Sequence, residues 1–122
     1  MQDYSPNQEI FDTVAKHLLT QKKRSDGPMQ NCLYRSKSGL KCAIGCLIPD
    51  EKYSPSFEGM SIRQLDKTKV LPAAYQGVSL AFLGGLQRLH DAYPPSTWNT
   101  RLYLFAALNN LSPAVVLSFT KE

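Results

Sequence analysis

Residues 5–22, with the sequence SPNQEIFDTVAKHLLTQK, carry the strongest structural signal in the chain. Apolar residues recur in this stretch at spacings of three and four, which is the period of one face of an α-helix. Ser5 and Gln8 match a capping box around Pro6 at the first helical position, so we expect the helix to begin there and to end near Lys22. Its predicted core face consists of Ile10, Phe11, Val14, Ala15, Leu18 and Leu19.

Two more helix starts lie in the second half of the chain. Ser61 and Gln64 match a second capping box, which predicts a short helix. Ser79 opens a longer helix that Pro94-Pro95 must end, because proline cannot continue the hydrogen-bond ladder. Gly84-Gly85 weaken this helix and indicate close packing against a neighbour.

The C-terminal part predicts one more strong helix. Ser96 or Thr97 is the expected cap, and Asn109-Asn110 close the helix. Residues 112–119 are compatible with either a last helix or a strand. Their apolar stretch, 115–119, offers a homodimer contact if it is not buried internally.

The segment between these helices has a different pattern. Short apolar pieces at 32–34 and 40–42 flank a polar turn whose Gly39 suits a positive φ, so we predict a small β-hairpin. The run CAIGCLI at 42–48 is apolar apart from its thiols, which predicts burial. We expect a short helix there, in which Gly45 lets another backbone come close.

The composition indicates one globular domain spanning residues 1–122. With 43% hydrophobic and 20% charged residues, the chain is neither disordered nor of low complexity. The expected fold is α+β and mostly helical, with about four to five helices and a small β-hairpin. The chain shows no secretory leader and no apolar run of about 18 residues, so we expect a protein without a membrane span, located in the cytoplasm.

Positive charge is concentrated in one segment. Residues 16–41 hold seven basic residues and one acidic residue, a net charge of +6, whereas the whole chain carries +4. The end of the first helix explains part of this excess, because Lys22, Lys23 and Arg24 suit the negative pole of the helix dipole. The remainder could meet phosphates or an acidic protein surface.

The three cysteines, Cys32, Cys42 and Cys46, are an odd number, which argues against a disulfide framework and fits a reducing compartment. Together with His17 or His90 they could form a zinc site, although they lack the usual pairs on short knuckles. Buried free thiols are the simpler interpretation, and we assign no metal and no cofactor.

Catalytic motifs are weak. A thiol nucleophile needs a base, and His90 is the only plausible partner for Cys42 or Cys46. We interpret His90 instead as a polar residue on a helix flank, because Asp91 follows it directly and should point about 100° away. Asp50-Glu51 are adjacent carboxylates in a loop, with Glu58 nearby. We assign no catalytic residue and expect no enzyme.

One long run supports a resemblance. It comprises Cys32-Leu-Tyr-Arg35, the segment GLKCAIGCLIPD at 39–50, then Tyr53, Pro55 and Glu58-Gly59, with residues 86–91 and Trp98 as a looser continuation. This run resembles small uncharacterised proteins of tailed phages and prophages, and covers about half of the chain. The resemblance implies a phage accessory protein in the host bacterial cytoplasm. Proteins of that kind often bind and inhibit a host factor, including CRISPR machinery.

The leading functional hypothesis is therefore non-covalent binding to a host protein or nucleoprotein complex, as an anti-CRISPR-like inhibitor of bacterial defence. Arginine and tyrosine are common anchors at interfaces, while lysines mainly steer approach. The predicted contact residues are Lys22, Lys23, Arg24, Arg35, Lys37, Tyr53 and Phe57.

Two alternatives remain open. The first is a small nucleic-acid-binding module that uses the basic segment 16–41, with Tyr34 stacking on a base. The second is a cysteine-dependent enzyme or a zinc-binding protein.

Overall fold

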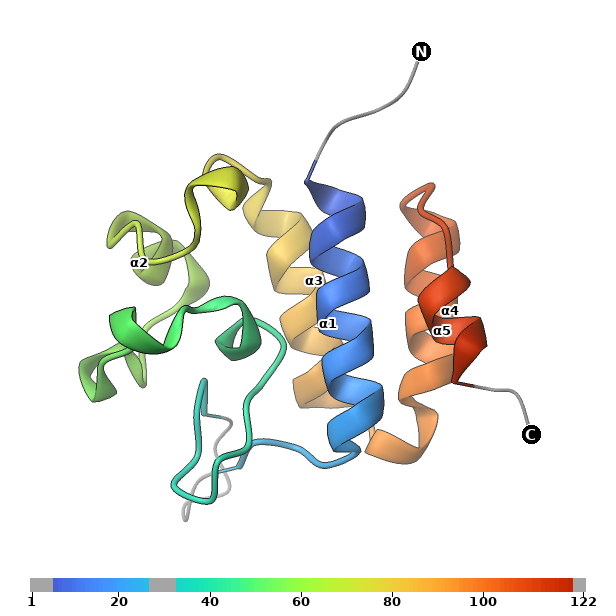
Figure 1. The fold of residues 1–122 in the computed structure, drawn as a ribbon, viewed down its shortest axis with the longest axis horizontal. Coiled ribbons are helices and arrows are strands. Elements are labelled where there is room, and N and C mark those ends of the chain that lie inside the picture. The colour runs from blue at the N-terminus through green and yellow to red at the C-terminus, as the bar shows by residue number, and fades with distance from the viewer. Residues whose placement is uncertain (1–5, 27–32, 120–122) are drawn as a thin grey trace.

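The computed structural model describes residues 6–26 and 33–119, which are mostly helical, as predicted. Helix α1 lies between α3 on one side and the pair α4 and α5 on the other, while α2 lies apart beside the end of α3 (Figure 1). The α-helices of this part are α1 (Asn7–Gln21), α2 (Ile62–Lys67), α3 (Leu80–Ala92), α4 (Trp98–Leu108) and α5 (Ala114–Ser118).

Helix α1 has the predicted core face and end. All six predicted core residues are buried, and Lys22 ends the helix in a left-handed conformation, with its N–H donating to the Leu18 carbonyl. Ser5, the expected cap, lies outside the described residues. The Gln8 side-chain oxygen, which would accept the cap amide in a capping box, accepts the Ser112 amide, and its NH2 group donates to Asp12 and to the Ser112 carbonyl.

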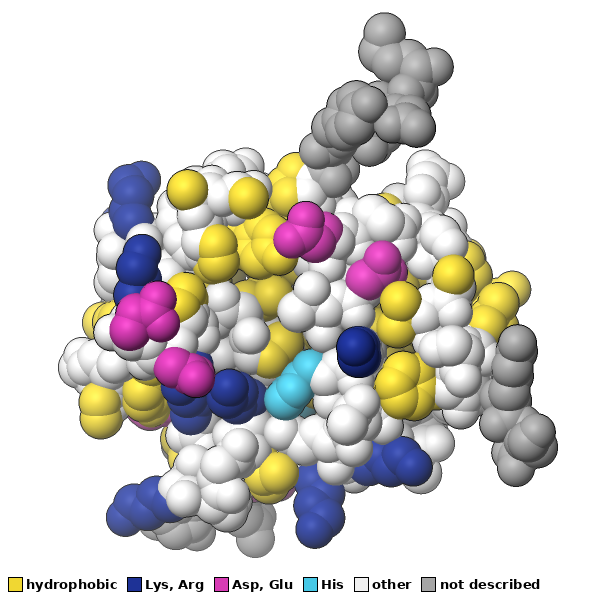
Figure 2. All heavy atoms as spheres, in the orientation of Figure 1, with side chains coloured by type: hydrophobic (Ala, Val, Ile, Leu, Met, Phe, Trp, Pro, Cys, Tyr) yellow, Lys and Arg dark blue, Asp and Glu magenta, His cyan; other side chains and the backbone are white. Residues whose placement is uncertain are grey.

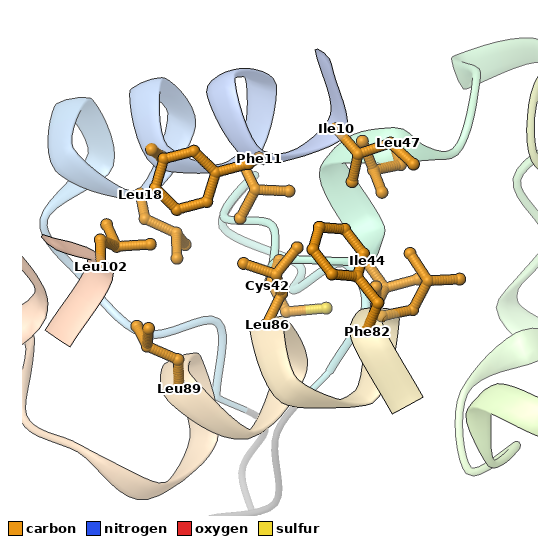
Figure 3. Packing of buried hydrophobic residues seen from close by; sticks show 14 of the residues in the cluster. Ile10, Phe11, Leu18, Cys42, Ile44, Leu47, Phe82, Leu86, Leu89 and Leu102 are labelled. Carbon is orange, nitrogen blue, oxygen red and sulfur yellow. The ribbon is translucent and has the colours of Figure 1, made fainter. Parts of the chain in front are cut away.

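One continuous cluster of apolar side chains fills the centre of the molecule. Phe11 and Leu18 of α1 face Leu86 and Leu89 of α3, and Leu102 approaches from α4 (Figure 3). The Phe105 ring of α4 stacks parallel to Phe11, with ring centroids 6.1 Å apart. Since α1 supplies side chains to neighbours on both of its sides, it is the central element of the packing.

The predicted β-hairpin is wrong. Residues 33–41 do turn, with Gly39 at a φ of 91°, but they contain only a single antiparallel bridge, between Arg35 and Lys41. The amides of Tyr34 and Arg35 donate to the carboxylate of Glu58. The Lys41 amide donates to the side chain of Gln21. Two backbone bonds join the sides of the turn, from Ser36 to Leu40 and from Cys42 to Tyr34, but the Tyr34 amide, which would extend this ladder, binds Glu58 instead.

The expected short helix at 42–48 is confirmed only in part, while the burial of the segment is confirmed. Only residues 45–47 form a turn of 3-10 helix, η1 (Gly45–Leu47), and two further 3-10 turns follow at η2 (Asp50–Lys52) and η3 (Pro55–Phe57). Cys42, Ala43, Ile44, Leu47 and Ile48 are all buried. This segment packs against α1 and covers that side of the core without forming a regular α-helix.

The capping signals of the second half are confirmed at two of three helices. Ser61 and Gln64 form the predicted capping box at α2, and Ser79 caps α3 by accepting from the Phe82 amide. Helix α3 ends at Ala92, before the two prolines. Neither predicted cap of α4 acts as one, because a 3-10 turn, η5 (Pro95–Thr97), precedes that helix and the Thr97 hydroxyl donates to the Pro94 carbonyl.

Residues 114–118 form a helix, which decides between the two conformations open for the tail. Val116 of α5 is buried against the core, and α5 contacts both α1 and α4. Within the described part of the chain, no helix has the length and apolar character that a membrane crossing needs.

Candidate functional site

Four of the predicted contact residues hold internal partners. The Arg35 guanidinium is 16% exposed and donates to the Ile48 carbonyl at 2.6 Å and to Asp50 Oδ1 at 2.8 Å. Its central carbon also lies 4.8 Å from the centre of the Tyr53 ring. The Tyr53 ring meets Phe57 edge-on, with centroids 6.2 Å apart. Three of the four residues thus form one cluster that joins the 33–41 turn to the following loop.

A half-buried carboxylate, that of Glu58, orders this cluster. Glu58 accepts the Tyr34 and Arg35 amides at 2.8 and 3.0 Å and the Tyr53 hydroxyl at 2.6 Å. Desolvation and this hydrogen bond raise the pKa of Tyr53 to about 12. The positive charge of Lys41, and then that of Arg35, lowers the pKa of Asp50 below its ordinary value. The loop carboxylates Glu58 and Asp50 thus organise structure and do not face each other across a cleft.

The fourth partnered residue is Arg24, which is half-buried and donates to the Asp91 carbonyl at 3.1 Å. The remaining predicted contacts, Lys22, Lys23 and Lys37, are exposed and make no ion pair with the rest of the described chain. Basic side chains gather along the lower part of the face shown in Figure 2, around the end of α1. The predicted contact set therefore divides into an internal group and an exposed group of lysines.

Ser25, His90 and Asp91 resemble a catalytic triad in composition but not in geometry. His90 is fully buried, and Asp91 Oδ1 lies 2.7 Å from its Nδ1, which corrects the expectation of a helix-flank residue that Asp91 cannot reach. The Ser25 backbone amide donates to His90 Nε2 at 3.0 Å, so this nitrogen is an acceptor and Nδ1 carries the proton. The Ser25 hydroxyl donates to the Leu40 carbonyl.

This arrangement has a structural effect. The imidazole of His90 stacks on Trp98, with centroids 5.4 Å apart, and binds the segment after α1 to α3. A nucleophilic serine would need its hydroxyl at the imidazole nitrogen that the Ser25 amide occupies. The three residues consequently connect α1, α3 and α4 and do not activate a hydroxyl.

The described thiols lack the features of reactive cysteines. Burial raises the pKa of Cys42 far above its ordinary value and raises that of Cys46 to about 12, so both stay protonated at neutral pH. Both ring nitrogens of His90 are bound elsewhere and cannot activate either thiol. Residues 6–26 and 33–119 contain no group of three His, Cys, Asp or Glu side chains that could hold a metal ion. Cys32 lies outside the described residues.

Exposed residues of the 115–119 stretch, which the sequence indicated as a contact, join exposed apolar residues of α4 that it did not indicate; we call this surface the α4–α5 face. The exposed fraction of these side chains ranges from 40% to 83%, and Leu108 is the most exposed of them. Apolar side chains gather on the side of the molecule where α4 and α5 lie (Figure 2). The face consists of Tyr103, Leu104, Leu108, Leu117 and Phe119.

A signal for this face was present in the sequence. Helix α4 buries Trp98, Leu102 and Ala106, and every residue from 102 to 108 is apolar, so the last two turns of the helix have no polar side. A helix that is apolar all round is normally covered on every side. Several large exposed apolar side chains on one side of a molecule are typical of interaction surfaces.

No family model matches the chain, and neither a curated protein nor a solved structure shows significant similarity to it.

Proposed function

We propose that this chain is a non-enzymatic binding protein that associates non-covalently with a host protein complex, as an anti-CRISPR-like accessory protein of a phage would. The observation that carries the binding function is the α4–α5 face, where five large apolar side chains are exposed on two adjacent helices. Covering such side chains is favourable by about 25 cal/mol for each Å² removed from water. The resemblance of residues 32–59 to phage proteins supports the class of target.

The geometry suggests a division of roles on the surface. Lys22, Lys23 and Lys37 are exposed and would steer an acidic partner, while the α4–α5 face would supply most of the contact energy. Arg35 and Tyr53 would support the loop because their side chains already bind each other and their neighbours. This changes the predicted anchors from Arg35, Tyr53 and Phe57 to residues of α4 and α5.

The test is affinity capture from a bacterial host lysate with mass spectrometry, with and without nuclease. We expect partners that survive nuclease and are lost with the double variant Tyr103→Ser/Leu117→Ser. The control is Ala81→Ser, an exposed substitution on α3 outside the α4–α5 face. Retention of every partner by the double variant would contradict the proposed surface, and loss of every partner on nuclease treatment would contradict protein binding.

Exposed basic residues favour nucleic-acid binding as a second candidate function. Lys16, Lys22, Lys23 and Lys37 are exposed and form no ion pair with other described residues. A phosphate backbone bound by these side chains would release counterions, with a salt slope of roughly −0.9 per contact. The test is a titration of DNA and RNA at several salt concentrations. Absence of binding at low salt would exclude this candidate, and a slope reduced by about 1 in Lys23→Gln would support it.

A further inference from the structure

A groove of about 240 Å³ lies between α3 and α4. Its apolar walls come from Leu89 and Tyr93 on the α3 side and from Leu104, Phe105 and Leu108 on α4. The residue Gly85 permits close contact here, because a Cβ at this position would lie 2.9 Å from the Phe105 ring. The predicted role of this glycine in close helix packing is thus confirmed.

The two charged side chains that line this groove are both arginines. Arg88 and Arg101 are exposed, and neither forms an ion pair with another described residue. The guanidinium of Arg101 lies over the Tyr93 ring, 4.0 Å from its centre. This stacking restrains the guanidinium at the edge of the groove. The N–H groups of the guanidinium point outward within its own plane and can still bind a carboxylate through two hydrogen bonds.

We infer that the α3–α4 groove binds an acidic amphipathic helix of a partner protein, with apolar side chains in the groove and carboxylates on Arg88 and Arg101. This inference rests on the proposed function, because both require a protein partner. It adds the chemistry of the partner segment, which is an acidic amphipathic helix. Charge complementarity favours an acidic partner, because the residues that line the groove include two cations and no carboxylate. Leu108, with 83% of its surface exposed, is the expected apolar anchor point.

Size and backbone geometry favour a helix over other occupants. The groove is smaller than the roughly 300–1,000 Å³ of typical small-molecule sites, so it suits a few side chains of a larger partner. An extended peptide usually adds to a free strand edge, and the groove is built from two helices, whose backbone groups are already paired. Helices instead dock into apolar grooves by residues spaced three, four and seven apart.

The test uses the purified full chain and a designed probe. The probe is a blocked, fluorescent peptide of about 15 residues with leucines at helical spacing and glutamates on the flanking positions. A second peptide has lysine at every glutamate position. We expect saturable binding of the acidic peptide in fluorescence anisotropy, with the largest amide NMR shifts at Gly85, Leu104 and Leu108. We expect the basic peptide to bind about tenfold more weakly.

Charge reversal makes the test specific. Arg88→Glu/Arg101→Glu should weaken the acidic peptide about tenfold and make the basic peptide the tighter ligand. Lys67→Glu, an exposed charge reversal on α2, is the matched control and should preserve the wild-type preference. Leu108→Ser should weaken both peptides, and its high exposure means that the variant should still fold.

Three results would overturn the inference. These are equal affinity for the two peptides, no binding up to about 1 mM, or amide shifts that map away from α3 and α4. A concentration-dependent dimer that Leu108→Ser abolishes would show a second copy as the occupant and would also overturn it. None of these results bears on nuclease-resistant capture through Tyr103 and Leu117, so failure here is distinguishable from failure of the proposed function.

Discussion

Gly45 lies where the backbone of Tyr34 passes over η1. A Cβ at Gly45 would lie 1.9 Å from the Tyr34 carbonyl oxygen and 2.7 Å from its carbon. That oxygen accepts the Cys42 amide at 3.2 Å and therefore cannot move away without loss of a hydrogen bond. The predicted close approach of another backbone to Gly45 is confirmed, and a larger residue at this position would force the backbone of Tyr34 to shift.

Gly45→Ala should lower the free energy of unfolding by about 1–3 kcal/mol, the typical cost of overpacking a closely packed site. Gly84→Ala is the matched control, because its Cβ would meet nothing nearer than the Ile62 Cδ1 at 3.9 Å. Since alanine favours a helix over glycine, Gly84→Ala should stabilise the protein by up to about 1 kcal/mol. Urea unfolding of both variants measures the difference, and equal stabilities would contradict the close contact.

His17 should make stability depend on pH. Its Nε2 lies 2.8 Å from the Lys41 carbonyl oxygen, and burial lowers the pKa of its imidazole below the ordinary 6.5. In the window between the lowered folded pKa and 6.5 the unfolded chain binds more protons, so stability rises with pH. As pH falls from about 7 to about 5, the wild type should lose stability.

The variant His17→Gln tests this dependence. Glutamine keeps a donor for the Lys41 carbonyl but does not titrate, so the loss of stability between these pH values should be smaller in the variant. Urea midpoints that fall in parallel for the two proteins would contradict a lowered pKa at His17.

At the scale of elements, the sequence predicted helix starts well where the capping residue and its hydrogen-bond partner are close in sequence. The Ser61 capping box and the Ser79 cap need only residues three positions away, so the pattern contains all of the information. Thr97 precedes α4 but does not cap it, because as part of η5 it has helical dihedral angles and its hydroxyl is turned toward the Pro94 carbonyl, to which it donates. Competition between neighbouring turns is not visible in a capping pattern.

The 33–48 segment shows why the rest of the fold could not be predicted in this way. Its turn at Gly39 and its burial followed from composition, but its hydrogen-bond partners are Gln21, Glu58 and Gln87, which are up to 43 residues away. These side chains bind amides at positions 34, 41 and 44, so that only a few backbone bonds of a hairpin or a helix form in the segment. Their proximity is a product of tertiary packing.

Ser61→Ala should destabilise the protein by about 1 kcal/mol, the typical cost of losing an N-cap. The variant removes the hydroxyl that accepts the Gln64 amide at 3.1 Å. Ser96→Ala is the matched control, since Ser96 is equally exposed but does not cap α4. Urea unfolding should separate the two variants. If they are equally stable, the capping box at α2 contributes nothing to the fold.

At the scale of the whole molecule, the sequence predicted exposure of the basic residues better than it predicted the apolar surface. Lys22, Lys23 and Lys37 are exposed as a contact role requires. Arg35 is not, because a guanidinium offers several donors and finds carbonyl, carboxylate and ring partners within its own chain. The α4 part of the α4–α5 face was not predicted, because residues 102–108 are all apolar and do not reveal which side of the helix faces inward.

The two ends of the described chain are joined by one side chain, and the last prediction concerns this link. Gln8 donates to the Ser112 carbonyl at 3.0 Å and accepts the Ser112 amide at 2.8 Å, which holds the start of α5 on α1. Gln8→Ala should cost about 1 kcal/mol and speed hydrogen exchange at the α5 amides more than at α3. Gln8→Glu keeps the acceptor but has no donor, so its effect should be similar or larger. Unchanged exchange in α5 would mean that the burial of Val116 alone holds this helix, and that the α4–α5 face persists without the link.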